Sequence, residues 1–129
     1  MSINTKMLTA IAAALNYLEN AVNALNKKDE DLFTKNVWHV VAELEYALFL
    51  FSITLQNGVM PKTKADPDLK KAEISHALAD ANKFLRDAEM LVNGGKFLEA
   101  YENVRSARNY VLKVQEELSK RRREASKKK

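Results

Sequence analysis

The chain has 129 residues, of which 47% are apolar and 29% are charged, and it contains three Gly, two Pro and no Cys. Its length suits a single domain, and its composition suits a folded, mainly helical protein rather than a disordered one. The absence of Cys excludes disulfides, zinc-thiolate sites and thiol catalysis, and it fits a reducing, cytoplasmic location.

The formal net charge of +4 is concentrated at one end of the chain. The last eleven residues, SKRRREASKKK, hold seven of the 21 Lys and Arg and one of the 17 acidic residues. Residues 1–118 therefore carry 14 cations against 16 acids. We divide the chain accordingly into a domain over residues 1–118 and a basic C-terminal extension over residues 119–129.

The first predicted helix covers residues 3–26. Its apolar residues recur at spacings of three and four, which places them on one helix face: Leu8, Ile11, Leu15, Leu18, Val22 and Leu25. The stretch MLTAIAAALNYL after Lys6 has the size of a signal-peptide core. The helical spacing continues beyond it, which favours a retained core helix over a secretion signal.

The second predicted helix follows the polar stretch NKKDED, where Asp29 or Asp31 is expected to cap its N-terminus, and it ends near Asn57. Its apolar stripe has the same spacing and consists of Phe33, Val37, Val40, Leu44, Ala47 and Phe51. The helix also contains YALFLFSITL, which is too short to span a bilayer and closely follows Glu43 and Glu45. We therefore expect no membrane span.

The third predicted helix follows a loop that contains both prolines. Asp66 as N-cap and Pro67 at the first helical position predict its start, and Gly94 and Gly95 its end. Its apolar residues are Ile74, Ala77, Leu78, Ala81, Leu85, Ala88, Leu91 and Val92. The fourth predicted helix follows the glycines, and its stripe consists of Phe97, Ala100, Val104, Ala107, Val111, Val114 and Leu118.

Short connections at residues 27–31 and 93–96 predict two helical hairpins, and the longer loop between them can cross the end of a bundle. The predicted fold is therefore all-α, an antiparallel four-helix bundle. A shift of 67 residues aligns the two halves without a gap and places Leu18 on Leu85 and Val37 on Val104. This match indicates an internal duplication, and a chance match between two Ala-rich helical patterns is the alternative.

Few residues here can carry catalysis or hold a metal ion. Glu73 and His76 have the spacing that di-metal bundles use, but such a site needs a second Glu-x-x-His, and Asn36 stands where His39 would require Glu. We interpret both histidines as ordinary side chains on helix surfaces. The chain also has no Gly-rich phosphate loop. We therefore predict a non-enzymatic protein without cofactor, metal or small-molecule substrate.

The second predicted helix has more apolar residues than one stripe requires. The surplus residues lie off the stripe: Tyr46, Phe49, Leu50 and Ile53. Such a helix is apolar nearly all round, so something must cover its second face. The cover is Val59 and Met60 from the following loop, deeper burial inside the bundle, or another protein chain. We favour an intermolecular interface, with either a second copy or a different protein.

The basic extension is the second candidate surface, and its cations are Lys120, Arg121, Arg122, Arg123, Lys127, Lys128 and Lys129. We expect a frayed extension; if the helix instead continues past Leu118, the cations also stabilise its carbonyl end. They are suited to contact RNA or DNA phosphates without reading bases. No aromatic residue stands among them, so a solvated tail is the alternative.

Together these features predict a helical interaction protein. It associates through the apolar face of its second helix and contacts nucleic acid or ribonucleoprotein through its basic C-terminus. The alternative is a protein-only adaptor or homodimer whose tail only increases solubility.

Overall fold

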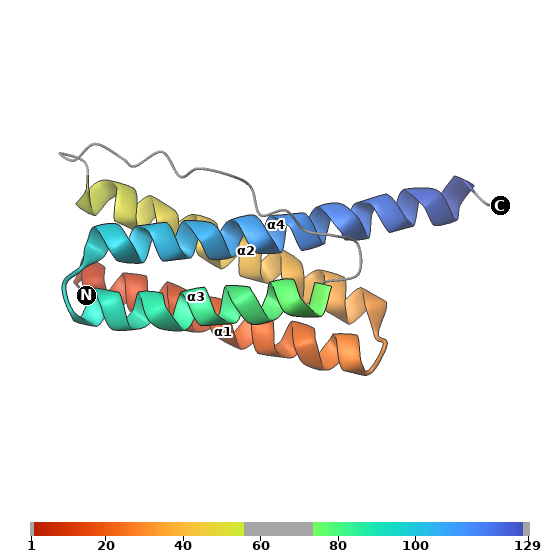
Figure 1. Cartoon of the computed structure of the whole chain (residues 1–129), viewed down its shortest axis with the longest axis horizontal. Helices are drawn as coiled ribbons and strands as arrows, with labels where there is room; N and C mark the ends of the chain where they lie inside the picture. Colours follow the sequence, from red (N-terminus) through yellow and green to blue (C-terminus); the bar gives the residue numbers. More distant parts are fainter. Residues whose placement is uncertain (1, 56–73, 128–129) are drawn as a thin grey trace.

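The computed structural model describes residues 2–55 and 74–127, and within these ranges it contains four α-helices and no strand (Figure 1). The helices are α1 (Ile3–Asn26), α2 (Glu30–Thr54), α3 (Ile74–Asn93) and α4 (Phe97–Lys127). They form two hairpins that pack as an antiparallel four-helix bundle, which confirms the predicted fold class. The predicted start of the third helix at Asp66 and Pro67 lies outside the described residues.

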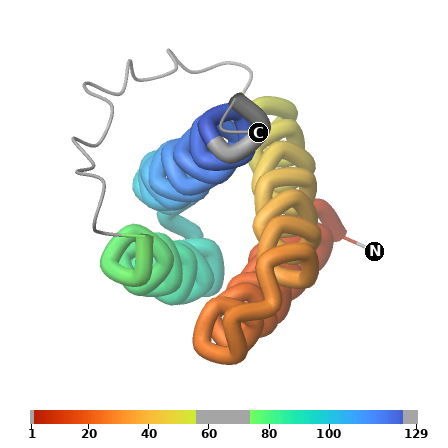
Figure 2. The backbone as a smooth tube through the Cα atoms, turned by 90° about the vertical axis from the view of Figure 1, so that its right-hand side faces the viewer, coloured from red at the N-terminus to blue at the C-terminus, as the bar shows by residue number. Residues whose placement is uncertain are grey.

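The helices occupy the corners of a square when the bundle is viewed from its end (Figure 2). Around the square, α1 contacts α2, α2 contacts α4, α4 contacts α3 and α3 contacts α1. In the described part of the chain, the backbones of the diagonal pairs do not approach each other closely, and their side chains share one core. Chain direction alternates around the square, so every neighbouring pair is antiparallel (Figure 1).

The predicted N-cap of α2 is confirmed. Asp29 Oδ1 accepts a hydrogen bond from the backbone N–H of Leu32 at 3.1 Å, and two further acids lie in the first turn, where the helix dipole is positive. In the same way, the hydroxyl of Ser2 caps α1 by accepting from the N–H of Thr5 at 3.2 Å. At its other end, α2 stops at Thr54, before the predicted end.

The two hairpin turns have the same backbone hydrogen bonds at positions 67 residues apart. In the first turn, Asp29 N–H donates to Ala24 O at 2.9 Å, and in the second, Lys96 N–H donates to Leu91 O at 2.8 Å. The preceding residue is left-handed in both turns, with φ values of 59° and 76°. This is the Schellman arrangement of helix ends. Its recurrence under one shift is what a duplicated hairpin predicts.

The core confirms the predicted stripes of α2 and α4. Every stripe residue of α2 is buried, as is every stripe residue of α4 except the half-buried Phe97. Phe51 of α2 and Tyr101 of α4 meet edge to face, with their ring centroids 6.2 Å apart. Asn36 is the one buried polar side chain in the described ranges, and its Nδ2 donates to Leu32 O at 2.9 Å.

The predicted stripe of α1 is only partly right. Ile11 and Leu18 are buried as expected. The other stripe residues lie at the edge of the core and are half-buried or exposed: Leu8, Leu15, Val22 and Leu25. Small side chains instead dominate the innermost face, which consists of Met7, Ala10, Ala14, Ala21 and Ala24 besides the two confirmed residues. Alanines let the neighbouring helices approach closely, and this displaces the larger residues sideways.

The helix α4 continues through most of the basic extension. It ends at Lys127, so the expectation of fraying directly after Leu118 is wrong. Figure 1 shows the C-terminal part of α4 projecting beyond the other helices. Leu118 is buried, whereas the described side chains that follow it are exposed. The boundary at residue 118 therefore marks where the helix leaves the core.

Candidate interaction surfaces

The face of α2 that points away from the core carries a row of exposed apolar side chains. The exposed fraction is 66% for Trp38, 46% for Tyr46, 59% for Phe49 and 42% for Ile53. With the exposed Ala42 they recur every three or four residues and form one stripe opposite the buried stripe. We call Trp38, Ala42, Tyr46, Phe49 and Ile53 the α2 ridge.

Three of the four residues predicted for this surface lie on the ridge, and Leu50 does not. Leu50 is only 5% exposed and belongs to the core. Successive residues of a helix are about 100° apart, which turns Leu50 towards the buried side when Phe49 points outward. The prediction of Leu50 as an interface residue is therefore corrected.

Sequence reasoning missed Trp38 and Ala42. Trp38 lies between Val37 and His39, outside the mainly apolar stretch 46–55 that contains the four predicted residues. The signal was the spacing of four, four, three and four from Trp38 to Ile53, which repeats the helical period on the face opposite the core stripe.

The matching positions of α4 are polar. The 67-residue shift places the α2 ridge on Arg105, Asn109, Lys113, Glu116 and Lys120. The same position in the bundle thus accepts polar, partly exposed residues in α4, so packing of the bundle does not require apolar residues there. A contiguous apolar surface that packs on nothing within the described ranges is typical of a binding site. Val59 and Met60, which the sequence offered as its cover, lie outside the described residues.

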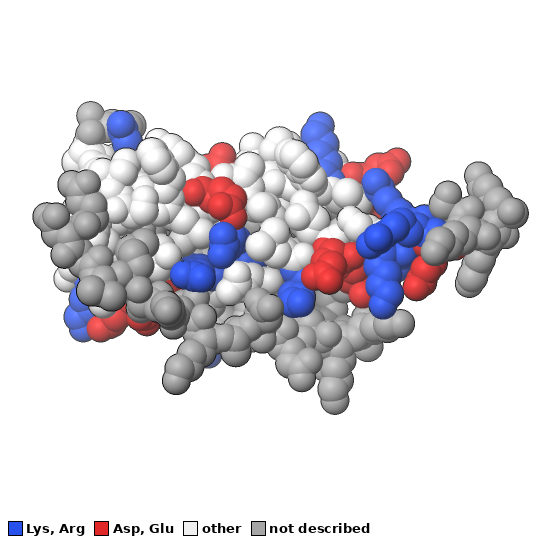
Figure 3. All heavy atoms as spheres, turned by 90° about the horizontal axis from the view of Figure 1, so that it is seen from above, with Lys and Arg blue, Asp and Glu red and all other residues white. Residues whose placement is uncertain are grey.

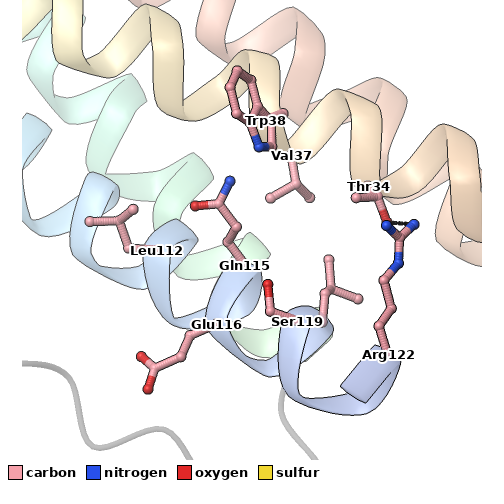
Figure 4. A pocket seen from close by; sticks show the side chains of 9 residues that line it. Thr34, Val37, Trp38, Leu112, Gln115, Glu116, Ser119 and Arg122 are labelled. Carbon is pink, nitrogen blue, oxygen red and sulfur yellow. Dashed lines mark hydrogen bonds between the residues drawn. The ribbon is translucent and has the colours of Figure 1, made fainter. Parts of the chain in front are cut away.

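A hollow of about 400 Å³ lies between α2 and α4 beside Trp38 (Figure 4). Thr34 and Trp38 border it from α2, while Gln115 and Ser119 border it from α4. Arg122 closes one end, where its Nη2 donates to Thr34 Oγ1 at 3.5 Å. The exposed indole therefore stands at the edge of a depression that a side chain from another molecule can enter.

A second hollow, of about 390 Å³, lies between the same helices beside Phe49. Arg108 Nη1 donates to Glu45 Oε1 at 3.0 Å, and this ion pair links α4 to α2. Arg105 Nη1 lies 3.4 Å from Tyr101 Oη, and no acidic side chain of the described ranges pairs with it. The Nε atoms of both arginines are buried without a hydrogen-bond partner. An exposed aromatic side chain beside partly buried arginines is typical of protein interfaces.

Cations gather at the C-terminal end of α4 (Figure 3). Residues 120–123 are exposed, and because they are consecutive in a helix they project in all directions around its axis. Arg122 Nη2 lies 3.7 Å from Asp31 Oδ1, and Arg121 Nε lies 3.4 Å from Glu117 Oε1. The remaining predicted cations have side chains outside the described part of the structure: Lys127, Lys128 and Lys129.

Removing residues 119–129 is expected to change the free energy of unfolding by no more than about 1 kcal/mol. The described side chains after Leu118 are exposed, and ion pairs between exposed groups contribute little. Urea unfolding followed by circular dichroism compares the full chain with a chain that ends at Leu118. A loss of about 2 kcal/mol or more would show that the extension packs on the bundle.

The two histidines lie apart. His39 stacks on Tyr17, with the ring centroids 4.6 Å apart, and His76 is exposed near the start of α3. Glu73, the predicted neighbour of His76, lies outside the described residues. In the ranges that the structure describes, no three His, Asp or Glu side chains are grouped as metal ligands.

Of the described helices, only α2 is long and apolar enough to cross a membrane. A core helix of a water-soluble protein passes the same test, so one such helix is weak evidence for a membrane span. The buried stripe of α2 packs in the core between α1 and α4, and its opposite face carries the exposed α2 ridge.

Comparison of the chain with protein families, with curated proteins and with solved structures finds no match. The class of the protein therefore follows from its own features. It is an all-α four-helix bundle with an apolar ridge on α2 and a basic end on α4.

Proposed function

We propose that this is a non-enzymatic interaction protein, which binds another protein chain through the α2 ridge and contacts nucleic acid or ribonucleoprotein through the basic end of α4. The difference between α2 and α4 carries the proposal. The helices α2 and α4 occupy equivalent positions in the bundle, but the outward face of α2 is apolar and that of α4 is polar. The apolar face has no role in packing the described core. Three exposed aromatic side chains in one stripe are typical of a binding surface.

The arrangement of the basic end supports contact with a polyanion. Residues 120–123 surround the helix axis beyond the core, so several phosphates can approach from different sides. Contacts of this kind release counterions and position a protein on nucleic acid without reading base sequence. The excess positive charge of the chain lies in this segment, while residues 1–118 carry more acids than cations.

The alternative function is a protein-only adaptor or homodimer with a solubilising tail. Ion pairs within the chain favour it, because Arg121 and Arg122 already have Glu117 and Asp31 as partners. Exposed pairs of this kind are weak and exchange readily with phosphate partners. We therefore keep contact with nucleic acid as the first proposal and make the adaptor an outcome of the test.

Two observations support a non-enzymatic role in the cytoplasm. The one buried polar side chain of the described core, Asn36, bonds to the backbone of its own helix. The chain has no Cys, which fits a reducing compartment.

Neutralising the basic end is expected to abolish binding of nucleic acid near physiological salt. The test variant replaces residues 120–123 with Gln in the full chain. The control variant removes the same charge elsewhere by replacing four exposed lysines, Lys6, Lys27, Lys83 and Lys96, with Gln. Fluorescence anisotropy with labelled single-stranded RNA and duplex DNA at about 50 and 200 mM salt measures both affinity and salt dependence.

The control variant should bind like the unmodified chain, and the test variant should lose binding at about 200 mM salt. The slope of log K against log salt should fall in magnitude by about 3 to 4, since each lost phosphate contact removes about 0.9. An equal loss in both variants would mean that only the net charge matters. No binding by any protein would favour the protein-only adaptor.

A further inference from the structure

The α2 ridge is complementary to itself when two copies run antiparallel. The spacing of its residues is nearly the same in both directions, because four of the five ridge residues form pairs that are symmetric about the midpoint of residues 45–46; the fifth, Tyr46, then faces Glu45 of the other copy. An antiparallel copy in that register places Trp38 opposite Ile53 and Ala42 opposite Phe49. Each pair occurs twice, as a twofold axis requires.

We propose that the partner of the α2 ridge is a second copy of this chain, packed antiparallel about a twofold axis that passes between Glu45 and Tyr46. This inference rests on the proposed function and specifies the partner of its apolar face. The other occupants of an apolar ridge, a different protein or a lipid surface, become outcomes of the test.

The side-chain sizes along the ridge fit this register. Ala42 leaves a gap between the larger side chains on either side of it, and the opposite residue, Phe49, is large and 59% exposed. A large side chain inserted above a small one lets two helices approach closely, as in the knobs-into-holes packing of coiled coils. Trp38 and Ile53 lie opposite each other at the two ends of the contact and extend its apolar surface.

The area of the ridge is that of the apolar centre of a dimer interface. From their exposed fractions, Trp38, Tyr46 and Phe49 together expose on the order of 250–400 Å². A standard interface buries about 800 Å² on each partner, and a little over half of it is apolar. The ridge with Ile53 therefore supplies most of the apolar part, and the flanking surfaces of α1 and α4 supply the polar rim.

The charge at the centre of the contact is already balanced. Glu45 lies next to the proposed axis, and its carboxylate pairs at 3.0 Å with Arg108 of the same chain. Two copies can meet without bringing two unpaired carboxylates together. The ridge itself contains no charged residue.

Single cysteines test the register directly, because the chain has no Cys of its own. In the proposed dimer, the two copies of residue 45 are offset by only about 1.5 Å along the helix axis, so with helix axes about 8–10 Å apart their Cα atoms come within roughly 4–8 Å of each other; the two copies of residue 42 are offset by about 10 Å along the axis alone. Disulfides join residues whose Cα atoms are about 4.4–6.8 Å apart. Glu45→Cys should therefore form a covalent dimer under mild oxidation, while Ala42→Cys and the α3 surface variant Lys83→Cys should not.

The one Trp of the chain reports on the ridge without any substitution. Trp38 is 66% exposed in the single chain, so burying it in a dimer should shift its emission to shorter wavelength as protein concentration rises. Sedimentation measured over the same range of concentration should give the same midpoint. Both measurements use the unmodified chain, so they still test the dimer if the Glu45→Cys variant does not fold.

Rapid cross-linking of Glu45→Cys alone, with the concentration-dependent blue shift, supports the proposal. Cross-linking of Ala42→Cys at the same rate overturns the register, and a monomer with constant emission overturns the second copy as partner. A monomer that binds RNA or DNA through residues 120–123 leaves the proposed nucleic-acid contact standing. A dimer that binds neither nucleic acid supports the inference and removes that contact instead.

Discussion

Replacing Phe51 with alanine is expected to lower the free energy of unfolding by about 3–5 kcal/mol. Phe51 is fully buried and meets Tyr101 edge to face across the α2–α4 contact. Its removal leaves a cavity that these two helices can close only in part. Single domains are stable by about 5–15 kcal/mol, so the loss is a large share of the total. Urea unfolding followed by circular dichroism measures it.

Phe49→Ala is the matched control, because it removes the same side chain two residues earlier in the same helix. Phe49 is 59% exposed, so the effect on the stability of the single chain should be within about 0.5 kcal/mol. Both variants are measured at low protein concentration, where association contributes least. Equal losses would contradict the division of α2 into a buried stripe and an exposed ridge.

The core stripes of α2 and α4 were predicted correctly because their apolar residues, alanines included, follow one helical period along the helix. The stripes from Phe33 to Phe51 and from Ala100 to Leu118 are buried as predicted. In α1 the rule that large apolar residues face the core was misleading. Its alanines are innermost, and Val22 is 36% exposed. How closely two backbones approach depends also on the side chains of the neighbouring helix. The apolar pattern of a single helix does not contain that information.

The two candidate surfaces also differ in how well the sequence alone could predict them. The basic segment is continuous in sequence, so composition alone was enough to predict it. The α2 ridge required both the period of the helix and the location of the core, which is why Leu50 was chosen and Trp38 was missed. The contact of Arg108 with Glu45 joins residues on two helices and depends on how α2 and α4 align. Such alignment is a property of the packed bundle.

The two proposed surfaces together predict a dimer with two basic ends. Arg122 lies beside Asp31, which is about 22 Å along α2 from the proposed twofold axis. The basic ends of the two chains would then lie about 45 Å apart at opposite ends of the dimer. At 3.4 Å per base pair, this distance corresponds to about 13 base pairs of duplex DNA. A longer duplex can therefore contact both ends, whereas a shorter one contacts a single end.

Phe49→Glu is accordingly expected to weaken binding to a duplex of about 30 base pairs by up to about 100-fold, because the loss of the dimer removes the second contact. Binding to a duplex shorter than about 10 base pairs should stay the same, since residues 120–123 are unchanged. Fluorescence anisotropy with both duplexes measures the two affinities for each protein.

Met90→Glu is the control for this comparison, because Met90 is 73% exposed on α3, away from the ridge, and the substitution adds the same charge. It should retain the preference of the unmodified chain for the longer duplex. If Phe49→Glu also retained that preference, the two basic ends would not act through a dimer formed by the α2 ridge. If both variants lost affinity equally for both duplexes, the added negative charge alone would explain the effect. Loss confined to the longer duplex and to Phe49→Glu requires that the ridge and the basic end act in one assembly.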